Sequence, residues 1–333
     1  MVAMQELPLV SVVVPVRNEE KFISRTLTQI VEQDYPRDKL EILVVDGMSE
    51  DGTEEIVKEI AKQYQFVKLL ENPQRLSSSG RNIGVRNSKG DILIFIDGHC
   101  YIPSGLFLRG MVDIFEKTQA FCLCRPAPPN PPDISSFQSA VALARNSFLG
   151  HGLDSTIYTQ KEGWVDPVSS GAIYKREIFE KVGCFDESFD ACEDVEFNFR
   201  IREAGLRGYT SPELTILYYP RDNLRGLFRQ MWRYGQGRLK FMRKHKNAIS
   251  LGQLIPSIFI ALLPFLFVVG LFKMYFIDVF FLLLCCYVLA VFYFSLRLST
   301  EHGWKYILHL PWIYFVIHFG LGLGFIGGFF KRS

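Results

Sequence analysis

The sequence lacks the marks of several common classes of protein. Its 333 residues carry a formal net charge of only +2 at pH 7, so no strong overall field favours nucleic acid as a partner. It contains neither a GxGxxG nor a Walker A pattern, which argues against dinucleotide-binding and P-loop sites. Residues 1–8 show no basic stretch followed by an apolar one, so we expect no signal peptide and an N-terminal domain that stays in the cytosol.

Cysteine patterns that would indicate a zinc site or a disulfide framework are also missing. The chain has seven cysteines, an odd number, and none of them forms a CxxC pair. Cys122 and Cys124 are closer together than the usual zinc half-site requires, and Cys285 and Cys286 lie in an apolar run. We therefore predict seven free thiols in a reducing compartment.

Acidic residues become scarce in the C-terminal part of the chain. Residues 1–250 contain nearly all of them and have the composition of a water-soluble protein, whereas residues 251–330 are mostly apolar and aromatic. We predict a domain over residues 1–220, a basic amphipathic interface region over 221–250 and a transmembrane region over 251–333. The basic region could instead be a core helix with a solvated basic face.

Three apolar stretches in the last region are long enough to cross a hydrocarbon core of roughly 30 Å, which gives two to three spans. They cover about 254–272, 276–296 and 306–330. The positive-inside rule places the basic segments 221–247 and 297–305 on the cytosolic side, which predicts a multi-pass protein of the cell (inner) membrane. The third stretch could instead re-enter the membrane, because it is rich in glycine and is followed by Lys331 and Arg332.

Apolar runs alternate with amphipathic segments through the first hundred or so residues. The pattern predicts strands over about 9–16, 40–45, 66–70 and 92–96, and helices over about 18–33, 53–64 and 76–88. Repeated strand–helix units favour a mostly parallel sheet with right-handed crossovers and helices on both faces. The fold class is therefore α/β.

Two of these strands end on aspartate. Asp46 and Asp97 are each followed by glycine, and His99 lies two residues beyond Asp97. Ligands of open α/β sheets bind at the carboxyl ends of the strands, where a carboxylate and an imidazole can both offer lone pairs to one divalent cation. The pattern predicts a metal–diphosphate site. One aspartate at a strand end is often only a helix cap, so the interpretation depends on there being two.

Six short motifs follow one another along the chain. They are Val14-Pro15-Val16-Arg17-Asn18-Glu19-Glu20, Asp46-Gly47-Met48-Ser49-Glu50-Asp51-Gly52-Thr53, Arg81-Asn82-Ile83-Gly84, Asp97-Gly98-His99, Glu193-Asp194 and Gln230-Met231-Trp232-Arg233-Tyr234. The set resembles the family 2 glycosyltransferases of the GT-A fold, and most of all the membrane-attached subgroup typified by the succinoglycan glucosyltransferase of bacterial exopolysaccharide synthesis. The resemblance covers residues 9–245, with a similar multi-span tail behind them.

The resemblance implies a nucleotide-diphosphate-sugar donor, a divalent metal and inversion at the anomeric carbon. Pro15, Glu19 and Asp46 match positions that line the nucleotide pocket in such enzymes. Arg81 and Asn82 match positions that open toward that pocket and contact the base or the diphosphate.

Asp97 and His99 occupy the DxD position of the family, which the resemblance makes the metal site. A metal there, Mn²⁺ or Mg²⁺, would neutralise the leaving diphosphate. Imidazole in place of the last carboxylate suits Mn²⁺ better than Mg²⁺.

Later motifs match positions on the acceptor side of the active site in this family. Asp194 matches the catalytic base that removes the proton from the acceptor hydroxyl, with Glu193 beside it. Taken alone, both acids would be typical of a helix N-terminus, where they favour the helix dipole. Gln230, Arg233 and Tyr234 match the QxxRW pattern of the family, with Tyr in place of Trp, and share one helix face. There Arg233 could bind the diphosphate and Tyr234 could stack near the acceptor.

We therefore expect an inverting glycosyltransferase that moves one sugar to a lipid-linked glycan at the cytosolic membrane face, in exopolysaccharide or cell-surface glycan synthesis. Other glycan-assembly proteins would be its partners. His151 and Trp164 are candidate acceptor contacts or ordinary loop residues. Tyr234 and the small number of spans argue against a processive polysaccharide synthase. A polyprenyl-phosphate glycosyltransferase, a nucleotidyltransferase and a non-catalytic membrane scaffold are competing functions for the same sequence.

Overall fold

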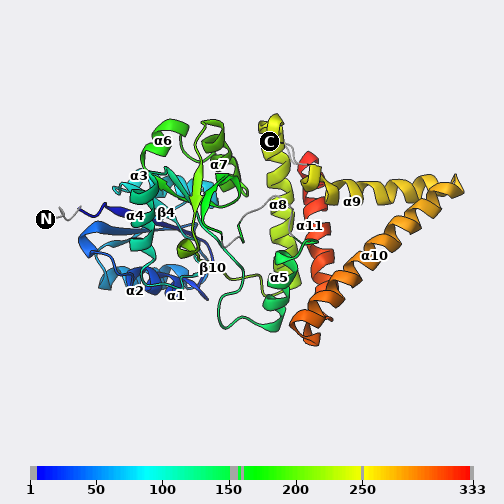
Figure 1. Cartoon of the computed structure of the whole chain (residues 1–333), viewed down its shortest axis with the longest axis horizontal. Coiled ribbons are helices and arrows are strands. Elements are labelled where there is room, and N and C mark those ends of the chain that lie inside the picture. Colours follow the sequence, from blue (N-terminus) through cyan, green and yellow to red (C-terminus); the bar gives the residue numbers. More distant parts are fainter. Residues whose placement is uncertain (1–5, 151–156, 159–160, 249–250, 331–333) are drawn as a thin grey trace. The chain divides into compact units, whose positions relative to one another are not determined.

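The computed structural model describes residues 6–150, 157–158, 161–248 and 251–330 (Figure 1). The chain forms two compact units. The first consists of Met1–Pro131 and Thr156–Tyr219, and the second of Pro132–Ser155 and Pro220–Ser333. The segment Pro132–Ser155 therefore groups with the C-terminal helices, although the sequence suggested that it belongs to a domain of residues 1–220.

The first unit is built on one sheet of eight strands in the order β3-β2-β1-β4-β8-β6-β9-β7. The strands are β1 (Val10–Val16), β2 (Leu40–Asp46), β3 (Val67–Glu71), β4 (Ile92–Phe95), β6 (Cys122–Cys124), β7 (Gly163–Val165), β8 (Gly171–Lys175) and β9 (Gly208–Thr210). The first four strands are parallel, and β8 runs antiparallel between β4 and β6. The predicted α/β fold with a mostly parallel sheet is confirmed.

Helices cover both faces of this sheet. They are α1 (Ile23–Val31), α2 (Thr53–Gln63), α3 (Ser77–Asn87), α4 (Phe107–Thr118), α6 (Glu177–Val182) and α7 (Glu193–Glu203), with single 3₁₀ turns at Arg37–Lys39, Pro167–Ser169 and Pro212–Leu214. The helices α1, α2 and α4 pack on one face, and α3, α6 and α7 pack on the other.

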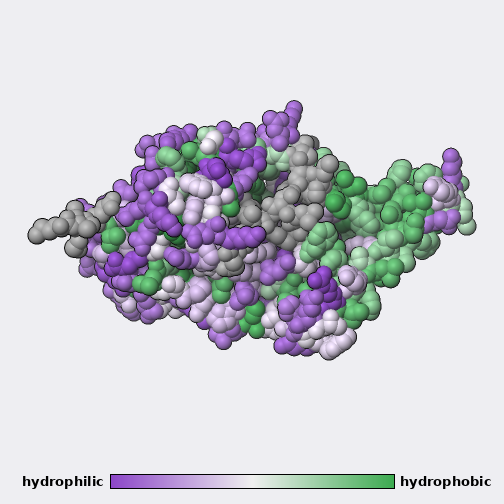
Figure 2. Space-filling model, in the orientation of Figure 1, coloured by the Kyte–Doolittle hydropathy of each residue, from purple (hydrophilic) through white to green (hydrophobic). Residues whose placement is uncertain are grey.

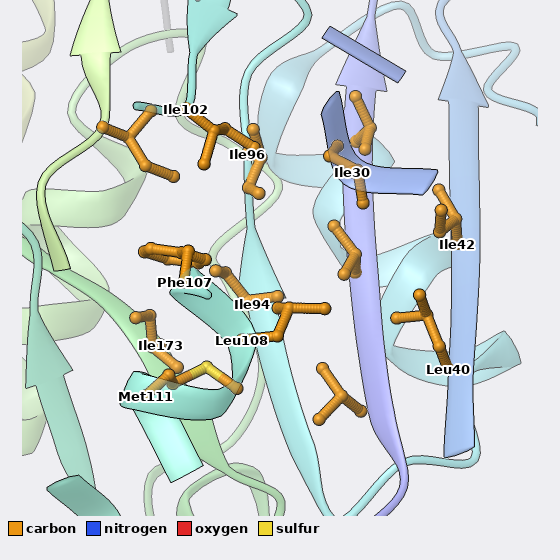
Figure 3. Packing of buried hydrophobic residues seen from close by; sticks show 14 of the residues in the cluster. Ile30, Leu40, Ile42, Ile94, Ile96, Ile102, Phe107, Leu108, Met111 and Ile173 are labelled. Carbon is orange, nitrogen blue, oxygen red and sulfur yellow. The ribbon is translucent and has the colours of Figure 1, made fainter. Parts of the chain in front are cut away.

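Alternate residues of the central strand β1 contribute to the two cores. Val12 and Val14 belong to the cluster on the α1 and α4 side, together with Ile94 and Met111 (Figure 3). Val13 belongs to the opposite cluster. Since successive side chains of a strand point to opposite faces, a strand covered on both faces is apolar throughout. Each such valine or isoleucine stabilises the fold by roughly 1.5–3 kcal/mol relative to an exposed one.

A second, small sheet was not predicted. Strand β5 (Cys100–Tyr101) pairs antiparallel with β10 (Leu217–Tyr218). The amide of Tyr219 also donates to the carbonyl of His99 at 3.2 Å. This pairing holds the segment just after Asp97 against Leu217–Tyr218, near the end of the first unit.

In the second unit, the regular elements that the structure describes are all helices. Its helices are α5 (Ser136–Asn146), α8 (Leu224–Lys244), α9 (Leu251–Gly270), α10 (Met274–His302) and α11 (Leu310–Phe330), with 3₁₀ turns at Lys246–Ala248 and Trp304–Tyr306. The core of the unit joins small residues of α5 to Leu227 and Met231 of α8 and to Ile313 and Ile317 of α11.

Among the described residues, α10 and α11 are long and apolar enough to cross a membrane, and α9 is apolar over Leu254–Gly270. Within the third predicted stretch, 306–330, residues Leu310–Phe330 form one continuous helix. The predicted polar link 297–305 is helical as far as His302, and Arg297 there pairs with Glu301 at 2.9 Å. Figure 2 shows the apolar surface gathered over α9 and α10.

In helix α8, Leu227 and Met231 are buried in the core shared with α11. The interface role of this basic segment stays a prediction. The free-thiol prediction holds for all seven cysteines.

Candidate active site

Helix α3 lies close against the central strands because two of its residues are glycine. A Cβ on Gly84 would lie only 2.2 Å from Cγ1 of Val13, and one on Gly80 would lie 3.4 Å from Cβ of Pro15. Only glycine therefore fits at position 84 without displacing the helix. The close contact keeps Pro15 beside α3, and it brings Arg81 over the ends of the strands.

The two strand-end aspartates lie at the same edge of the sheet. Val16 at the end of β1 pairs with Asp46 at the end of β2, and Val13 pairs with Phe95 of β4. Asp97 follows β4 by two residues. Both aspartates therefore lie at the carboxyl edge, where ligands of α/β sheets bind.

Arg81 connects two acidic residues that are far apart in the sequence. Its Nε lies 3.3 Å from Oε1 of Glu193, at the start of α7, and its Nη2 lies 3.3 Å from Oδ1 of Asp97. The side chains of Arg81 and Glu193 are 11% and 8% exposed, whereas that of Asp97 is 36% exposed. The guanidinium also lies over the rings of Phe95 and Phe185 at 5.3 and 5.6 Å. The pairs are therefore buried on the Glu193 side and accessible on the Asp97 side.

The electrostatics of this group follow from its burial. Burial opposes the charge of Arg81, but the carboxylates of Glu193, Asp97 and Asp194 outweigh it and raise the pKa of the guanidinium. Burial raises the pKa of Glu193, against the attraction of Arg81 and with the like charge of Asp194. Arg81 is thus a permanent cation, since a raised pKa moves it further from neutral pH.

Asp194 is the exposed member of the group. It follows Glu193 in the first turn of α7, and its Oδ1 accepts a hydrogen bond from the amide of Val195 at 2.8 Å. An acid in that position also stabilises the helix N-terminus, because its negative charge is favourable to the helix dipole. Its exposure leaves the carboxylate able to meet a substrate.

Asn82, predicted to open toward the donor, has hydrogen-bond partners inside the protein. Its amide nitrogen donates to the carbonyl of Phe185 at 2.8 Å and to Glu187 at 2.9 Å. Its amide oxygen accepts from the Phe185 amide at 2.9 Å. Both amide hydrogens are thus used inside the protein. Asn82 braces the loop that leads to α7 and so helps to position Asp194.

Asp46 shapes the loop that follows β2. Its carboxylate accepts hydrogen bonds from the hydroxyl of Ser49 at 2.5 Å and from the amide of Ser49 at 2.9 Å. Asn18 links the same loop to the one after β1, because its side chain accepts from the amide of Glu50 at 2.8 Å. An ionised carboxylate has about four acceptor sites. Asp46 can therefore accept further hydrogen bonds from a ribose hydroxyl or a base.

Glu19 and His99 form a second pair. Nδ1 of His99 lies 2.8 Å from Oε1 of Glu19, and the two side chains are only 12% and 14% exposed. The imidazole meets the ring of Tyr218 edge-on at 4.8 Å. A Cβ on Gly98 would lie 3.0 Å from Cγ of Glu19, so glycine there permits the close approach. Glu19 thus holds His99 through Oε1, and its place in the nucleotide pocket stays a prediction.

The donor set at this edge suits a divalent cation only with help from a substrate. Among the residues that the structure describes, no group of three or more His, Cys, Asp or Glu is arranged to hold a metal ion. A histidine that ligates a metal usually has its other ring nitrogen beside a carboxylate, as Nδ1 of His99 lies beside Glu19. Neither ring nitrogen is accessible to solvent. Asp97 and His99 offer a carboxylate and an imidazole, donor types that suit Mn²⁺, but the imidazole is enclosed in this structure.

The sequence prediction missed Arg125. This residue follows β6, which lies two strands from β4 and runs parallel to it, so it too lies at the carboxyl edge. Its Nη1 donates to the carbonyl of Phe95 at 3.1 Å, and the residue is 9% exposed. Burial raises the pKa of the Cys100 thiol to about 12, against the opposing effect of the Arg125 charge. A lone arginine directly after an apolar run was the signal in the sequence.

The remaining predicted residues belong to other elements of the chain. Gln230, Arg233 and Tyr234 belong to α8 in the second unit, where Gln230 is buried and Arg233 is exposed. Trp164 lies on the edge strand β7, packs edge-on against Tyr209 at 5.5 Å and is 45% exposed. His151 lies outside the described residues.

Comparison with known proteins places this geometry in a family. The model of "Glycosyl transferase family 2" matches residues 11–183, and that of "Glycosyl transferase family group 2" matches residues 149–326. The succinoglycan biosynthesis protein ExoA of Rhizobium meliloti is 33% identical over 74% of this chain and 73% of its own. The chain therefore belongs to glycosyl transferase family 2, and the protein is a glycosyltransferase.

Two further relatives extend over nearly the whole chain. The dolichyl N-acetyl-alpha-D-glucosaminyl phosphate 3-beta-D-2,3-diacetamido-2,3-dideoxy-beta-D-glucuronosyltransferase of Methanococcus voltae is 27% identical over 97% of this chain and 98% of its own. The structure of mannosyltransferase PcManGT from Pyrobaculum calidifontis, in complex with GDP-Man and Mn²⁺, superposes with a TM-score of 0.63. It is 21% identical, and the match covers 99% of this chain and 89% of that one. The fold is thus of the GT-A type.

Proposed function

We propose that the protein is an inverting, metal-dependent glycosyltransferase that moves one sugar from a nucleotide-diphosphate-sugar to a lipid-linked glycan at the cytosolic membrane face. The observation that carries the proposal is the group in which Arg81 pairs with both Asp97 and Glu193, with Asp194 exposed beside it. In this group the carboxylate of Asp97 is accessible at the sheet edge, and that of Asp194 is exposed at the start of α7.

On the donor side, Asp97 is the residue that a cation and a diphosphate would meet. Arg81 holds Oδ1 of Asp97, which fixes the direction of the carboxylate. A divalent cation bound there would supply Lewis-acid stabilisation of the leaving diphosphate. His99, held by Glu19, would be the second protein ligand. Pro15 and Asp46 lie at the same strand ends and flank the nucleotide.

On the acceptor side, Asp194 is the general base. Its carboxylate takes the proton of the acceptor hydroxyl while the hydroxyl oxygen attacks the anomeric carbon. Glu193 is ruled out for this step because it is buried and paired with Arg81. The Arg81–Glu193 pair instead fixes the first turn of α7 relative to Asp97. A single base on one side is the arrangement that inversion requires.

The relatives support a lipid-linked acceptor and a role in surface glycans. The Methanococcus voltae protein is named for a dolichyl-phosphate-linked sugar, and the Rhizobium meliloti protein for succinoglycan biosynthesis. Helices α10 and α11 are candidates for membrane contact. For Gln230, Arg233 and Tyr234 of α8, contacts with the diphosphate and the acceptor stay a prediction.

A donor screen tests the proposal directly. The purified full-length protein is incubated with nucleotide-diphosphate-sugars, a polyprenyl-diphosphate-linked glycan and Mn²⁺ or Mg²⁺, and nucleoside diphosphate release and product mass are measured. One added sugar of inverted configuration is the expected product. A ladder of long polymer would indicate a processive synthase, and transfer to bare polyprenyl phosphate would indicate a lipid-phosphate sugar donor. Absence of release with every donor would contradict the proposal.

The base is tested by Asp194→Asn. Loss of a general base lowers the rate by about 10²–10⁴-fold, so kcat should fall by that factor while the KM of the donor changes little. Glu203→Gln, at an exposed position in the last turn of the same helix, is the matched control and should keep full activity. Unchanged transfer by Asp194→Asn would remove Asp194 as the base.

The metal ligands are tested by Mn²⁺ titration of activity. We expect Asp97→Asn to raise the Mn²⁺ concentration for half activation most, followed by His99→Gln. Glu19→Gln should raise it by about 10–100-fold, which is typical of residues that orient a ligand. A normal Mn²⁺ requirement in His99→Gln would leave Asp97 as the only protein ligand at this edge.

A further inference from the structure

Helices α8 and α11 touch backbone to backbone through glycine. A Cβ on Gly324 of α11 would lie 2.2 Å from the carbonyl oxygen of Trp232, and one on Gly235 of α8 would lie 2.2 Å from that of Leu321. The glycines at 320, 324 and 328 repeat every four residues and so form one face of α11. Such small-xxx-small faces allow helices to pack at the closest distance.

The two helices run in the same direction along most of their length. Gly320 faces Met231, and Gly328, eight residues further along, faces Leu239, which is also eight residues further along. Both helices have 21 residues. At 1.5 Å per residue each is about 32 Å long. Wherever α11 lies, α8 therefore lies alongside it.

The charge of α8 limits where that pair can lie. The helix contains five arginines, two lysines and neither aspartate nor glutamate. Arg229 and Arg233, near its middle, are exposed. Charged side chains at the centre of a hydrocarbon core are costly. If α11 crossed the membrane, it would carry these charges into the hydrocarbon.

Helices α9 and α10 have the opposite character. Helix α9 has no charged residue, and α10 has only Asp278 before Arg297. Large apolar side chains on them are exposed, among them Phe265, Leu282 and Phe292. In Figure 1 they extend away from α11 and meet at the turn 271–273. With 20 residues, α9 is about 30 Å long, which matches a hydrocarbon core.

We infer that α9 and α10 form a two-span hairpin and that α11 does not cross the membrane. Instead α11 and α8 lie together in the interface on anionic phospholipid headgroups. The basic side chains of α8 meet the headgroups, and the exposed Trp312 and Phe315 of α11 enter the interfacial layer. The C-terminus then lies on the cytosolic side. This inference rests on the membrane attachment proposed above.

The distribution of charge agrees with this topology. Lys331 and Arg332 follow α11 in the sequence, and a two-span hairpin keeps them on the cytosolic side with α8, as the positive-inside rule requires. Lys273, in the turn between the two spans, is the one basic residue placed on the far side. A three-span topology would put Lys331 and Arg332 outside.

Protease protection of two epitope-tagged full-length proteins tests the topology. One carries the epitope after Ser333, and the other carries it between Phe272 and Lys273. We expect the C-terminal epitope to be digested only in inverted vesicles, and the turn epitope only in right-side-out vesicles. Digestion of the C-terminal epitope from outside would show that α11 spans. Protection of the turn epitope from both sides would show a re-entrant hairpin. Either result overturns the inference.

Carbonate extraction separates this failure from failure of membrane attachment. A protein that stays in the membrane pellet at alkaline pH but shows an external C-terminus refutes only the two-span topology. A protein that is released into the supernatant refutes the attachment, and with it the topology. Retention in the pellet together with the expected digestion pattern supports both.

Discussion

Arg81 of the first unit and the arginines near the start and middle of α8 in the second unit differ in burial. Arg81 is 11% exposed and lies between two carboxylates at 3.3 Å, whereas Arg225, Arg229 and Arg233 of α8 are exposed on a helix without acids. The buried cation can act only through the groups that it holds. The exposed ones can attract anions from outside, such as phosphates or lipid headgroups. The location of a charge, more than its identity, therefore separates a positioning residue from a docking surface.

The largest effect should come from removing the buried cation. Arg81→Gln leaves Glu193 buried without its partner, and breaking a buried pair in this way costs about 3–5 kcal/mol of unfolding free energy. Activity should fall by more than about 100-fold, because Asp97 and the first turn of α7 both lose their fixed direction. Chemical unfolding followed by tryptophan fluorescence and transfer assays measure the two effects.

A control on the same helix makes this test specific. Arg86 also lies on α3, where its exposed side chain meets Glu187 at 3.4 Å. Surface pairs contribute about 0–1 kcal/mol, so Arg86→Gln should change little. Equal destabilisation by the two substitutions would contradict the distinction between buried and exposed arginine.

The next effect concerns the glycine contact that carries α8. Gly324→Leu places a large side chain where even a Cβ lies 2.2 Å from the Trp232 carbonyl oxygen. Overpacking of this kind costs about 1–3 kcal/mol and should separate α8 from α11. Thermal unfolding of the detergent-solubilised protein should show a lower midpoint. Phe315→Leu, at an exposed position of the same helix, should leave the midpoint unchanged.

Local sequence features predicted the first four strands, the helices between them and the strand-end aspartates. Runs such as 9–16 and 40–45 are apolar on both faces, and this property is encoded in neighbouring residues. The contacts that position the site were not predictable in the same way. Glu19 meets His99 eighty residues away, and Asn82 braces Phe185. These pairings depend on how distant segments pack, which no local pattern contains.

The membrane region shows the same limit. Hydropathy marked the stretch 306–330 as a possible span because it scores each segment by itself. The glycines that press α11 against α8 are visible in the sequence, but their partner helix is about ninety residues earlier. Likewise Arg125 was passed over, since nothing near it in the sequence shows that it reaches the carbonyl of Phe95. The inference of two spans therefore draws on tertiary contacts.

The smallest effect should come from the exposed charges of α8. Each Lys or Arg near an anionic surface contributes about 1 kcal/mol, and this attraction is screened by salt. Arg225→Gln with Arg229→Gln should therefore reduce the stimulation of activity by anionic lipid nanodiscs over zwitterionic ones. Salt should also reduce this stimulation less in the double variant than in the unchanged protein. Activity in detergent should stay the same. Lys58→Gln with Lys62→Gln, on the exposed face of α2, removes the same charge from a helix without a lipid role. If both double variants respond to lipid and salt alike, α8 does not rest on the membrane, and its arginines form only the solvated face of a core helix.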